Sequence, residues 1–234
     1  MELLQQALSY LEQEPLLNID MLEAIRRNKA DILAASEKGA LLYHTAAAAY
    51  MMSAEEQGTA RDMLSLIPKA TLFAAHQPLI VPLAEKALNL KPSLVCVQAA
   101  YLKKEPVAMD YEGVRIKRLD QSHFTFIRDW YTHGPDEDYL LERLGAGVLY
   151  GAYAGGELAG FIGEHAEGSI GMLEILPQYR RRGLGEKLEA YRTNAHLRAG
   201  YVPFGQILTG NTPSLGLQKK LGYTVSEDTV VWLQ

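Results

Sequence analysis

Residues 170–192 read IGMLEILPQYRRRGLGEKLEAYR and decide the fold of the second half of the chain. An apolar run ends at Pro177, three arginines and a Gly-Leu-Gly turn follow, and the remainder has helical spacing. Leu184, Leu188 and Tyr191 fall on one face of such a helix. A strand that passes through a turn into a helix leaves N–H groups unpaired at a partly positive helix end. The stretch therefore predicts an anion site.

The glycines of this turn define the kind of anion site. Gly183 and Gly185 have no Cβ, so a phosphate can approach the main chain closely. No Lys followed by Ser or Thr comes after them, which excludes the P-loop of nucleotide triphosphatases, and the spacing also differs from the G-x-G-x-x-G of dinucleotide folds.

Two motifs carry a family resemblance. The order R-x-x-G-x-G, from Arg180 to Gly185, resembles the acetyl-coenzyme A loop of the GCN5-related N-acetyltransferases, the GNAT family. The later stretch NTPSLGLQKKLGY, residues 211–223, is similar to a second signature of that family, a helix that opens with Asn and ends in Lys-Leu-Gly-aromatic before the last strand. Their order and spacing indicate a GNAT domain.

The composition is that of an ordinary globular protein. The chain has 234 residues, 48% apolar residues and a net charge of −5, which argues against broad nucleic-acid binding. No apolar stretch is long enough to cross a bilayer, and the N-terminus does not resemble a signal peptide. Cys96 is the only cysteine, so no disulfide can form within the chain and a reducing cytoplasm is expected. We expect its thiol to be buried in the core. The histidines lack metal-ligand spacing, so no metal is expected.

The first half predicts helices, a hairpin and a strand-helix-strand unit. We expect Asp20 to cap a helix, Ser53 and Glu56 to form a capping box, and the alanines of 46–49 to continue a strand or to be helical. The expected helices cover about 3–11, 20–28, 56–67 and 78–90, and the expected strands 31–35, 40–50, 70–75 and 93–102, with a turn at 36–39.

The second half predicts a β-α-α-β-β-β-α-β-α-β order, which matches the GNAT fold. Asp120 or Ser122 can cap the first helix, which runs to about Thr132 before His133-Gly134-Pro135 breaks it. The other expected elements are strands at 114–119, 148–154, 158–165, 170–176, 201–208 and 224–233, and helices at 136–144, 184–199 and from Asn211. We expect an α/β fold with a mixed, mostly antiparallel sheet flanked by helices.

A charged segment between the halves predicts a domain boundary. We place an N-terminal α/β domain at 1–105 and a catalytic GNAT domain at 113–234. The first half repeats the same coarse plan but has His76-Gln77-Pro78 at the turn where R-x-x-G-x-G is expected. It resembles a degenerate GNAT copy, as in the tandem branch similar to glycine N-acyltransferases. Residues 202–205 (VPFG) and Gln218 also resemble that branch.

The resemblance implies a set of cofactor contacts. Main-chain N–H groups of the loop would bind the diphosphate of coenzyme A, three arginine side chains would pair with its phosphates, and the end of the preceding strand would bind its pantetheine arm with one N–H facing the thioester oxygen. The residues expected to bind the cofactor are Ile175, Leu176, Arg180, Arg181, Arg182, Gly183, Leu184, Gly185, Glu186, Asn211 and Gln218.

The general base is open. Many GNAT enzymes have a glutamate where this chain has Ser169, which cannot act as a base but can hold a water. Glu174 is the next candidate, because a carboxylate in a strand is costly unless it is used or paired. The alternative for Glu174 is a pairing with an arginine or a place at a sheet edge. Glu164 and His165 are the other candidates.

The general acid is open as well. The family often has a tyrosine at the position of Gln218, and a glutamine can donate a hydrogen bond but cannot give up its proton. Either the thiolate is only stabilised or another group, such as Tyr179 or Tyr223, protonates it.

The sequence thus predicts an enzyme, a cytoplasmic N-acetyltransferase that transfers acetyl from acetyl-coenzyme A, or another acyl group from its coenzyme A ester, to a primary amine of a small molecule. The acceptor would lie near residues 133–138. No nucleic-acid or membrane partner is expected, and the first half would serve a homodimer or cover the acceptor. The alternative is a non-catalytic acyl-coenzyme A sensor. A nucleotide-binding module is disfavoured by the missing Lys-Ser/Thr.

Overall fold

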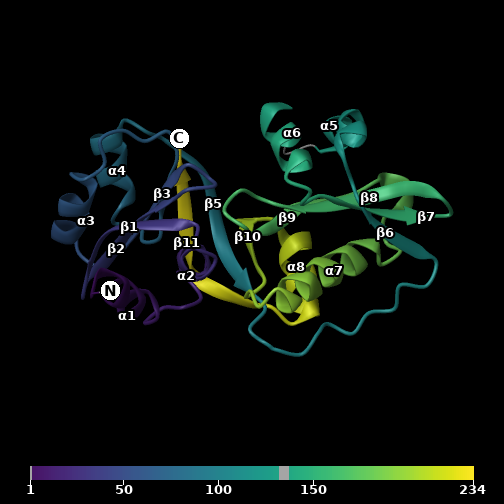
Figure 1. The fold of residues 1–234 in the computed structure, drawn as a ribbon, viewed down its shortest axis with the longest axis horizontal. Helices are drawn as coiled ribbons and strands as arrows, with labels where there is room; N and C mark the ends of the chain where they lie inside the picture. The colour runs from purple at the N-terminus through teal and green to yellow at the C-terminus, as the bar shows by residue number, and fades with distance from the viewer. Residues whose placement is uncertain (1, 132–136) are drawn as a thin grey trace. The chain divides into compact units, whose positions relative to one another are not determined.

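The computed structural model describes residues 2–131 and 137–234, which form two compact units. The first unit contains residues 1–100, 206–219 and 223–234, and the second contains 101–205 and 220–222. Each unit has its own sheet and its own apolar core (Figure 1).

The first unit is built on a seven-stranded sheet with the order β1-β2-β3-β4-β11-β5-β10. Strands β3 and β4 pair in parallel, whereas β11 pairs antiparallel with both β4 and β5. Its strands are β1 (Ala30–Ser36), β2 (Gly39–His44), β3 (Ala49–Ala54), β4 (Phe73–Ala75), β5 (Pro92–Ala100), β10 (Phe204–Leu208) and β11 (Thr224–Leu233).

Helices cover both faces of this sheet, because consecutive residues of β2, β3 and β4 are buried and successive side chains point to opposite faces. The helices α1 (Glu2–Leu11) and α2 (Ile19–Arg26) pack on one face, around Met51 and Trp232. The helices α3 (Gln57–Leu64) and α4 (Val81–Leu88) pack on the other, around Phe73 and Leu233. Helix α8 (Thr212–Leu221) precedes β11.

The second unit is built on a four-stranded antiparallel sheet with the order β6-β7-β8-β9. Its strands are β6 (Val114–Arg118), β7 (Tyr150–Ala154), β8 (Glu157–Glu164) and β9 (Ile170–Ile175). The hairpin between β7 and β8 turns at Gly155-Gly156, as expected, with Ala154 opposite Glu157.

Helices also cover both faces of the second sheet. The helices α5 (Phe124–Trp130) and α6 (Glu137–Gly145) pack on one face around Phe161, after a short 3₁₀ helix, η1 (Gln121–His123), that Asp120 caps as expected. On the other face lies α7 (Leu184–Arg198), whose Leu188 packs against Ile162. A second 3₁₀ helix, η2 (Pro177–Tyr179), leads from β9 toward α7.

Three local predictions for the first half are wrong. Asp20 does not cap α2, since its carboxylate binds His76 instead, with 2.8 Å between Oδ1 and Nε2. Ser53 lies inside β3, where its hydroxyl accepts a hydrogen bond from the Gln77 side chain, so no capping box precedes α3. The expected strand 40–50 is two strands joined by a turn in which Ala48 has φ +50°.

The expected division at 105–113 remains a prediction about domains. The contacts group the chain differently, because the last strand, β11, lies between β4 and β5 in the first unit. The two units defined by packing therefore have other boundaries than the two domains predicted from the sequence.

Candidate active site

The candidate site is built on β9, an edge strand of the four-stranded sheet. Glu174 pairs with Phe161, but Gly171 pairs with Gly163, so β9 carries one residue more than β8 between these pairs. Met172 has φ +52° there. This is a β-bulge, which disrupts the ladder and redirects side chains. Sequence reasoning missed it, although a glycine such as Gly171 inside a strand is a known signal for a bulge.

The main chain at the end of β9 faces two ways. The N–H of Leu176 donates to the carbonyl of Ala159 on β8 at 3.0 Å, and its carbonyl accepts the N–H of Tyr179 at 2.8 Å. Both groups of Leu176 therefore have partners within the chain. Because alternate residues point to opposite sides in an antiparallel pair, the N–H and C=O of Ile175 point away from β8. Of the two residues predicted to bind pantetheine, Ile175 has the better-placed main chain.

The loop before α7 presents its N–H groups outward. Arg181 has φ +60° and Gly183, the N-cap residue of α7, has φ +73°, both in the left-handed region. No residue that the structure describes accepts a hydrogen bond from the N–H groups of residues 181–186, and no side chain caps the helix. Such a run of N–H groups at a helix N-terminus forms a cradle for an anion. We call residues 181–186 the amide cradle.

Gly183 keeps the amide cradle open. A Cβ placed on this residue would meet nothing within 4 Å, so the space beside it is free. A side chain there would be strained by the positive φ and would occupy that space. Among the other predicted contacts, Leu184 is buried, and the Glu186 carboxylate pairs with Lys220.

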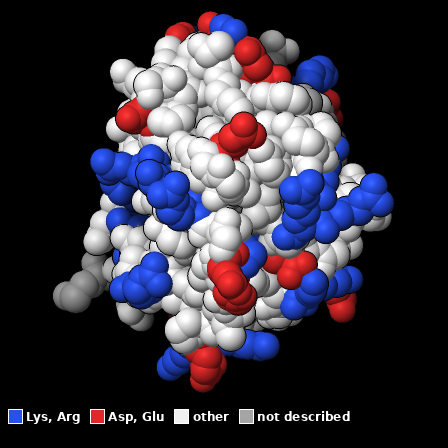
Figure 2. Space-filling model, turned by 90° about the vertical axis from the view of Figure 1, so that its right-hand side faces the viewer, with Lys and Arg blue, Asp and Glu red and all other residues white. Residues whose placement is uncertain are grey.

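The three arginines differ in their contacts, although all are exposed. The Arg180 guanidinium donates from Nε to the Ile175 carbonyl at 2.9 Å and from Nη2 to the Glu174 carboxylate at 3.1 Å. Arg182 lies over the ring of Tyr179 at 5.5 Å. Figure 2 shows Lys and Arg side chains in separate groups, with acidic side chains between them, and no continuous basic surface on that face.

Glu174 pairs with an arginine at a sheet edge, which is the predicted alternative to a role as general base. Its side chain is 15% exposed and forms an ion pair with Arg180, and β9 is a sheet edge. It lies near the phenol of Tyr131: burial, and then the charges of Glu174 and Glu167, raise the pKa of that phenol to about 12. Its role as a base stays a prediction.

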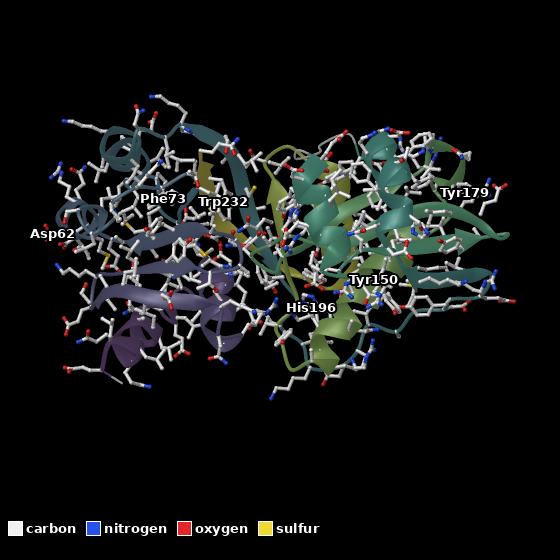
Figure 3. The ribbon with its side chains drawn as sticks, turned by 45° about the horizontal axis from the view of Figure 1, so that its top comes forward. Asp62, Phe73, Tyr150, Tyr179, His196 and Trp232 are labelled. Carbon is white, nitrogen blue, oxygen red and sulfur yellow. The ribbon has the colours of Figure 1, made fainter. Side chains whose placement is uncertain are left out.

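The other predicted catalytic residues of this sheet have partners of their own. The buried Ser169 hydroxyl donates to the Glu167 carboxylate. Glu164 pairs with Arg192 and, at 2.9 Å, with Nε2 of His196 on α7. In Figure 3, His196 and Tyr150, whose ring lies 4.5 Å from the Arg192 guanidinium, are well apart from Tyr179, which immediately precedes Arg180. Glu164 therefore belongs to a cluster against α7.

His165 has a partner that sequence reasoning missed. The hydroxyl of Tyr139, on α6, accepts the N–H of Ala166 at 3.1 Å and lies 3.1 Å from Nδ1 of His165. Burial strongly raises the pKa of Tyr139, so its hydroxyl keeps its proton. Nδ1 of His165 thus has the Tyr139 hydroxyl as its hydrogen-bond partner. No spacing in the sequence connects these residues, because they lie on different elements.

The second signature folds as predicted but lies mainly in the other unit. Asn211 caps α8 by accepting the N–H of Ser214 at 3.1 Å, and Gln218 is buried within that helix. Both residues belong to the first unit, so their contacts with a cofactor stay predictions. Tyr179, an alternative acid, donates to Glu157 at 2.6 Å, a bond that raises its pKa, and Tyr223 is buried. Residues 133–136 of the expected acceptor loop, together with the predicted helix end at Thr132 and the break at 133–135, lie outside the described residues.

Two negative findings apply to residues 2–131 and 137–234. This part of the chain contains no group of His, Cys, Asp and Glu side chains that could hold a metal ion. None of its helices is both long and apolar enough to cross a membrane.

Comparison with known sequences gives one family. Residues 147–233 match the model of the FR47-like proteins, a range that begins before β7 and includes both predicted signatures. No curated protein matches the sequence.

Solved structures match nearly the whole chain. A Drosophila protein aligns with a TM-score of 0.66 and 16% identity over 96% of this chain and 92% of its own. An acetyltransferase of the GNAT family from Novosphingobium aromaticivorans aligns with a TM-score of 0.54 and 17% identity over 94% and 96%. A GCN5-related N-acetyltransferase from Kribbella flavida gives 0.58 and 15% over 93% and 94%. The resemblance predicted from the sequence is thereby confirmed: the chain has the α/β fold of the GCN5-related N-acetyltransferases, and residues 147–233 carry the pattern of the GNAT-related FR47-like family.

Proposed function

We propose that the protein is an acyl-coenzyme A-dependent N-acyltransferase that transfers acetyl from acetyl-coenzyme A to a primary amine of a small molecule. One observation carries the proposal. The N–H groups of the amide cradle have no acceptor among the described residues, and the cradle follows a strand whose last residue, Ile175, turns its main chain away from the sheet.

The amide cradle fits the anionic part of coenzyme A. Several N–H groups converge at the positive end of a fifteen-residue helix, where a diphosphate is favoured. Arg180, Arg181 and Arg182 are exposed and add charge-assisted hydrogen bonds to phosphate. When bound, acetyl-coenzyme A supplies a thioester whose carbonyl carbon an amine can attack.

The edge of β9 supplies the orientation. The N–H and C=O of Ile175 bind an extended amide chain as an added strand would, which directs its far end along β9. A main-chain N–H fixed at this edge stabilises negative charge on an acyl oxygen at no cost of reorganisation. Removal of one such donor in other enzymes costs about 3 kcal/mol.

The attacking amine needs a proton acceptor, and Glu174 is the carboxylate beside this edge. It lies one residue before Ile175, and its side chain is mostly buried. Proton transfer to a positioned carboxylate contributes about a hundredfold or more to the rate. Gln218 cannot protonate the leaving thiolate, because an amide gives up no proton.

The test is cofactor binding followed by transfer. Calorimetry with coenzyme A should show binding to the full chain, and incubation of acetyl-coenzyme A with a panel of amino acids, polyamines and amine drugs should release free thiol with at least one acceptor. Absence of coenzyme A binding would reject the proposal.

A non-catalytic acyl-coenzyme A sensor is the second candidate, and a specific observation favours it. Each predicted base has a partner: Glu174 binds Arg180, Glu164 binds Arg192 and His196, and His165 contacts the Tyr139 hydroxyl. Tight binding of acetyl-coenzyme A with neither hydrolysis nor transfer to any amine would establish this candidate instead.

The remaining assignments follow from the proposed reaction. We propose a cytoplasmic enzyme whose acceptor is a small amine and which acts without a nucleic acid, a membrane or a metal. The first half either mediates a homodimer or covers the acceptor, and sedimentation of the purified chain distinguishes the two roles.

A further inference from the structure

The side chain of Arg180 makes a bridge that phosphate binding alone does not require. Its Nε donates to the Ile175 carbonyl at 2.9 Å, while its Nη2 donates to Oε1 of Glu174 at 3.1 Å. The guanidinium therefore joins the outward-facing main chain at the end of β9 to the candidate base. Its side chain is 57% exposed, so it can leave this position without unpacking a core.

The bridge occupies the edge where a ligand strand would add. The N–H of Leu176 is bound to Ala159 on β8, which directs the carbonyl of Ile175 to the open side. That carbonyl is the acceptor that an amide N–H of an added extended chain would use. Arg180 holds the same acceptor, so a chain that adds to this edge must move the guanidinium.

The bridge also gives the Glu174 carboxylate a partner of opposite charge. Arg180 is the only cation that forms an ion pair with Glu174 among the described residues, and the carboxylate side chain is only 15% exposed. The Tyr131 phenol lies near the carboxylate, and burial together with the charges of Glu174 and Glu167 holds its proton. While the bridge stands, the Arg180 guanidinium occupies a Glu174 oxygen that would accept a proton from the amine.

We propose that Arg180 is a displaceable latch: it holds Glu174 and the Ile175 carbonyl in the free protein and releases both when coenzyme A binds. The proposal rests on the proposed function. The diphosphate gives the guanidinium a doubly charged, bidentate partner, which is a stronger acceptor than one carbonyl and one carboxylate oxygen. Glu174 then stands without its cation beside the reacting amine, so the base becomes available only after the cofactor has bound.

The test is a double-mutant cycle on coenzyme A affinity, measured by calorimetry with full-length wild type, Glu174→Gln, Arg180→Ala and the double variant. Glu174→Gln weakens the latch, so we expect coenzyme A to bind about threefold to tenfold more tightly than to wild type. In the Arg180→Ala background the same substitution should give no further gain, because no latch remains to be loosened.

Glu157→Gln is the matched control. Glu157 lies near the same loop through its bond to Tyr179, and its substitution removes the same charge without contact with Arg180. Its effect on affinity measures the general influence of an acid near a polyanion, and it should be equal with and without Arg180.

The outcomes separate the two proposals. If wild type does not bind coenzyme A, the proposed function falls and the latch falls with it. If coenzyme A binds, but Glu174→Gln and Glu157→Gln change affinity equally, or the effect of Glu174→Gln persists without Arg180, the latch is wrong while the proposed function stands.

Discussion

The turn after β4 in the first unit and the turn after β9 in the second unit have the same plan, a strand that leads into a helix, but they treat their polar groups oppositely. In the first, the Gln77 side chain accepts the N–H of Ala54 at 2.8 Å and donates to Ser53 at 2.8 Å. The fully buried His76 contacts the Met52 carbonyl and the Asp20 carboxylate. In the second, the N–H groups of the amide cradle have no acceptor in the described chain.

The difference teaches what makes such a turn a binding site. Main-chain carbonyls accept the N–H groups of residues 76, 80 and 81 in the first turn. Prolines at 78 and 82 remove N–H donors from the turn and from the start of α4. Left-handed residues at Arg181 and Gly183 direct the donors of the second turn outward instead. One architecture therefore gives a closed turn or an anion site, depending on a few residues.

The largest expected effect concerns the closed turn. Asp20→Ala would leave the ring of His76 and the amide of Gln206, which donates to Asp20 at 3.0 Å, without their acceptor in a fully buried place. Each buried donor left without its acceptor costs about 1–3 kcal/mol. Urea denaturation should show this loss.

The control for that prediction is an exposed pair in the same unit. Glu56→Gln removes the ion pair with Lys38, and the denaturation midpoint should hardly change. Equal effects of the two substitutions would show that the closed turn is not held by its buried pair.

The next effect concerns the chemistry at the open turn. Glu174→Gln should lower kcat about a hundredfold at saturating amine, because the amide keeps the shape of the side chain but accepts no proton. Steady-state kinetics on the acceptor found in the screen measure it, with Glu157→Gln as control. A kcat for Glu174→Gln equal to that of wild type would remove Glu174 as the base.

A further effect concerns the cradle itself and the number of sites. Calorimetry should give one coenzyme A per chain, since only one of the two turns is open. Gly183→Asp places a carboxylate beside the amide cradle, where it repels phosphate, so affinity should fall at least about thirtyfold. The positive φ also strains the new side chain, a cost in stability that the control variant shares.

Gly200→Asp is the matched control for the cradle. Gly200 follows α7 at its other end, also has a positive φ of +78°, and has equally free space beside it. Its variant should bind coenzyme A as wild type does. Two cofactors per chain, or equal losses in both variants, would contradict the comparison.

The smallest effect concerns the face of β9 that carries Glu174. Burial raises the pKa of Tyr131 to about 12, whereas an unfolded tyrosine titrates near 10. Below pH 10 both states keep the proton; between pH 10 and 12 only the unfolded state loses it, so the folded state loses stability as pH rises. Tyr131→Phe should remove about 1 kcal/mol of this loss at pH 11.

The measurement is chemical denaturation at several pH values. Below pH 9 wild type and Tyr131→Phe should differ by a constant amount, and the two curves should converge or cross only above that pH. Parallel curves up to pH 12 would show that the Tyr131 phenol is not held in its neutral form.

Much of the fold was predictable because its signals are local. The Gly155-Gly156 turn, the Asp120 and Asn211 caps and the strand at 224–233 each depend on a few neighbouring residues, and each is confirmed. Asp20 was assigned as a cap for the same local reason, and that was wrong because His76, far along the chain, binds its carboxylate.

The sequence predicted where the main chain of the candidate site leaves N–H groups open, but it predicted fewer of the contacts that the side chains make. The glycine spacing of 183 and 185 indicated an open helix start, and the uncapped N-terminus of α7 agrees with it. The bulge at Met172 and the bond from Tyr139 to His165 depend on strand register and on packing between distant elements. Neither feature produces a regular spacing of residues that could be recognised in the sequence.

The place of β11 has a consequence for biosynthesis. Val231 pairs with Ala75 on one side and with Val95 on the other, so the sheet of the first unit has a gap in its middle until the ribosome has delivered β11. Two strand edges, β4 and β5, remain open to wrong partners on the nascent chain during that time. Helices α1 to α4 precede β11 by more than a hundred residues, so the first unit can complete its sheet only after the strands of the second unit have been synthesised.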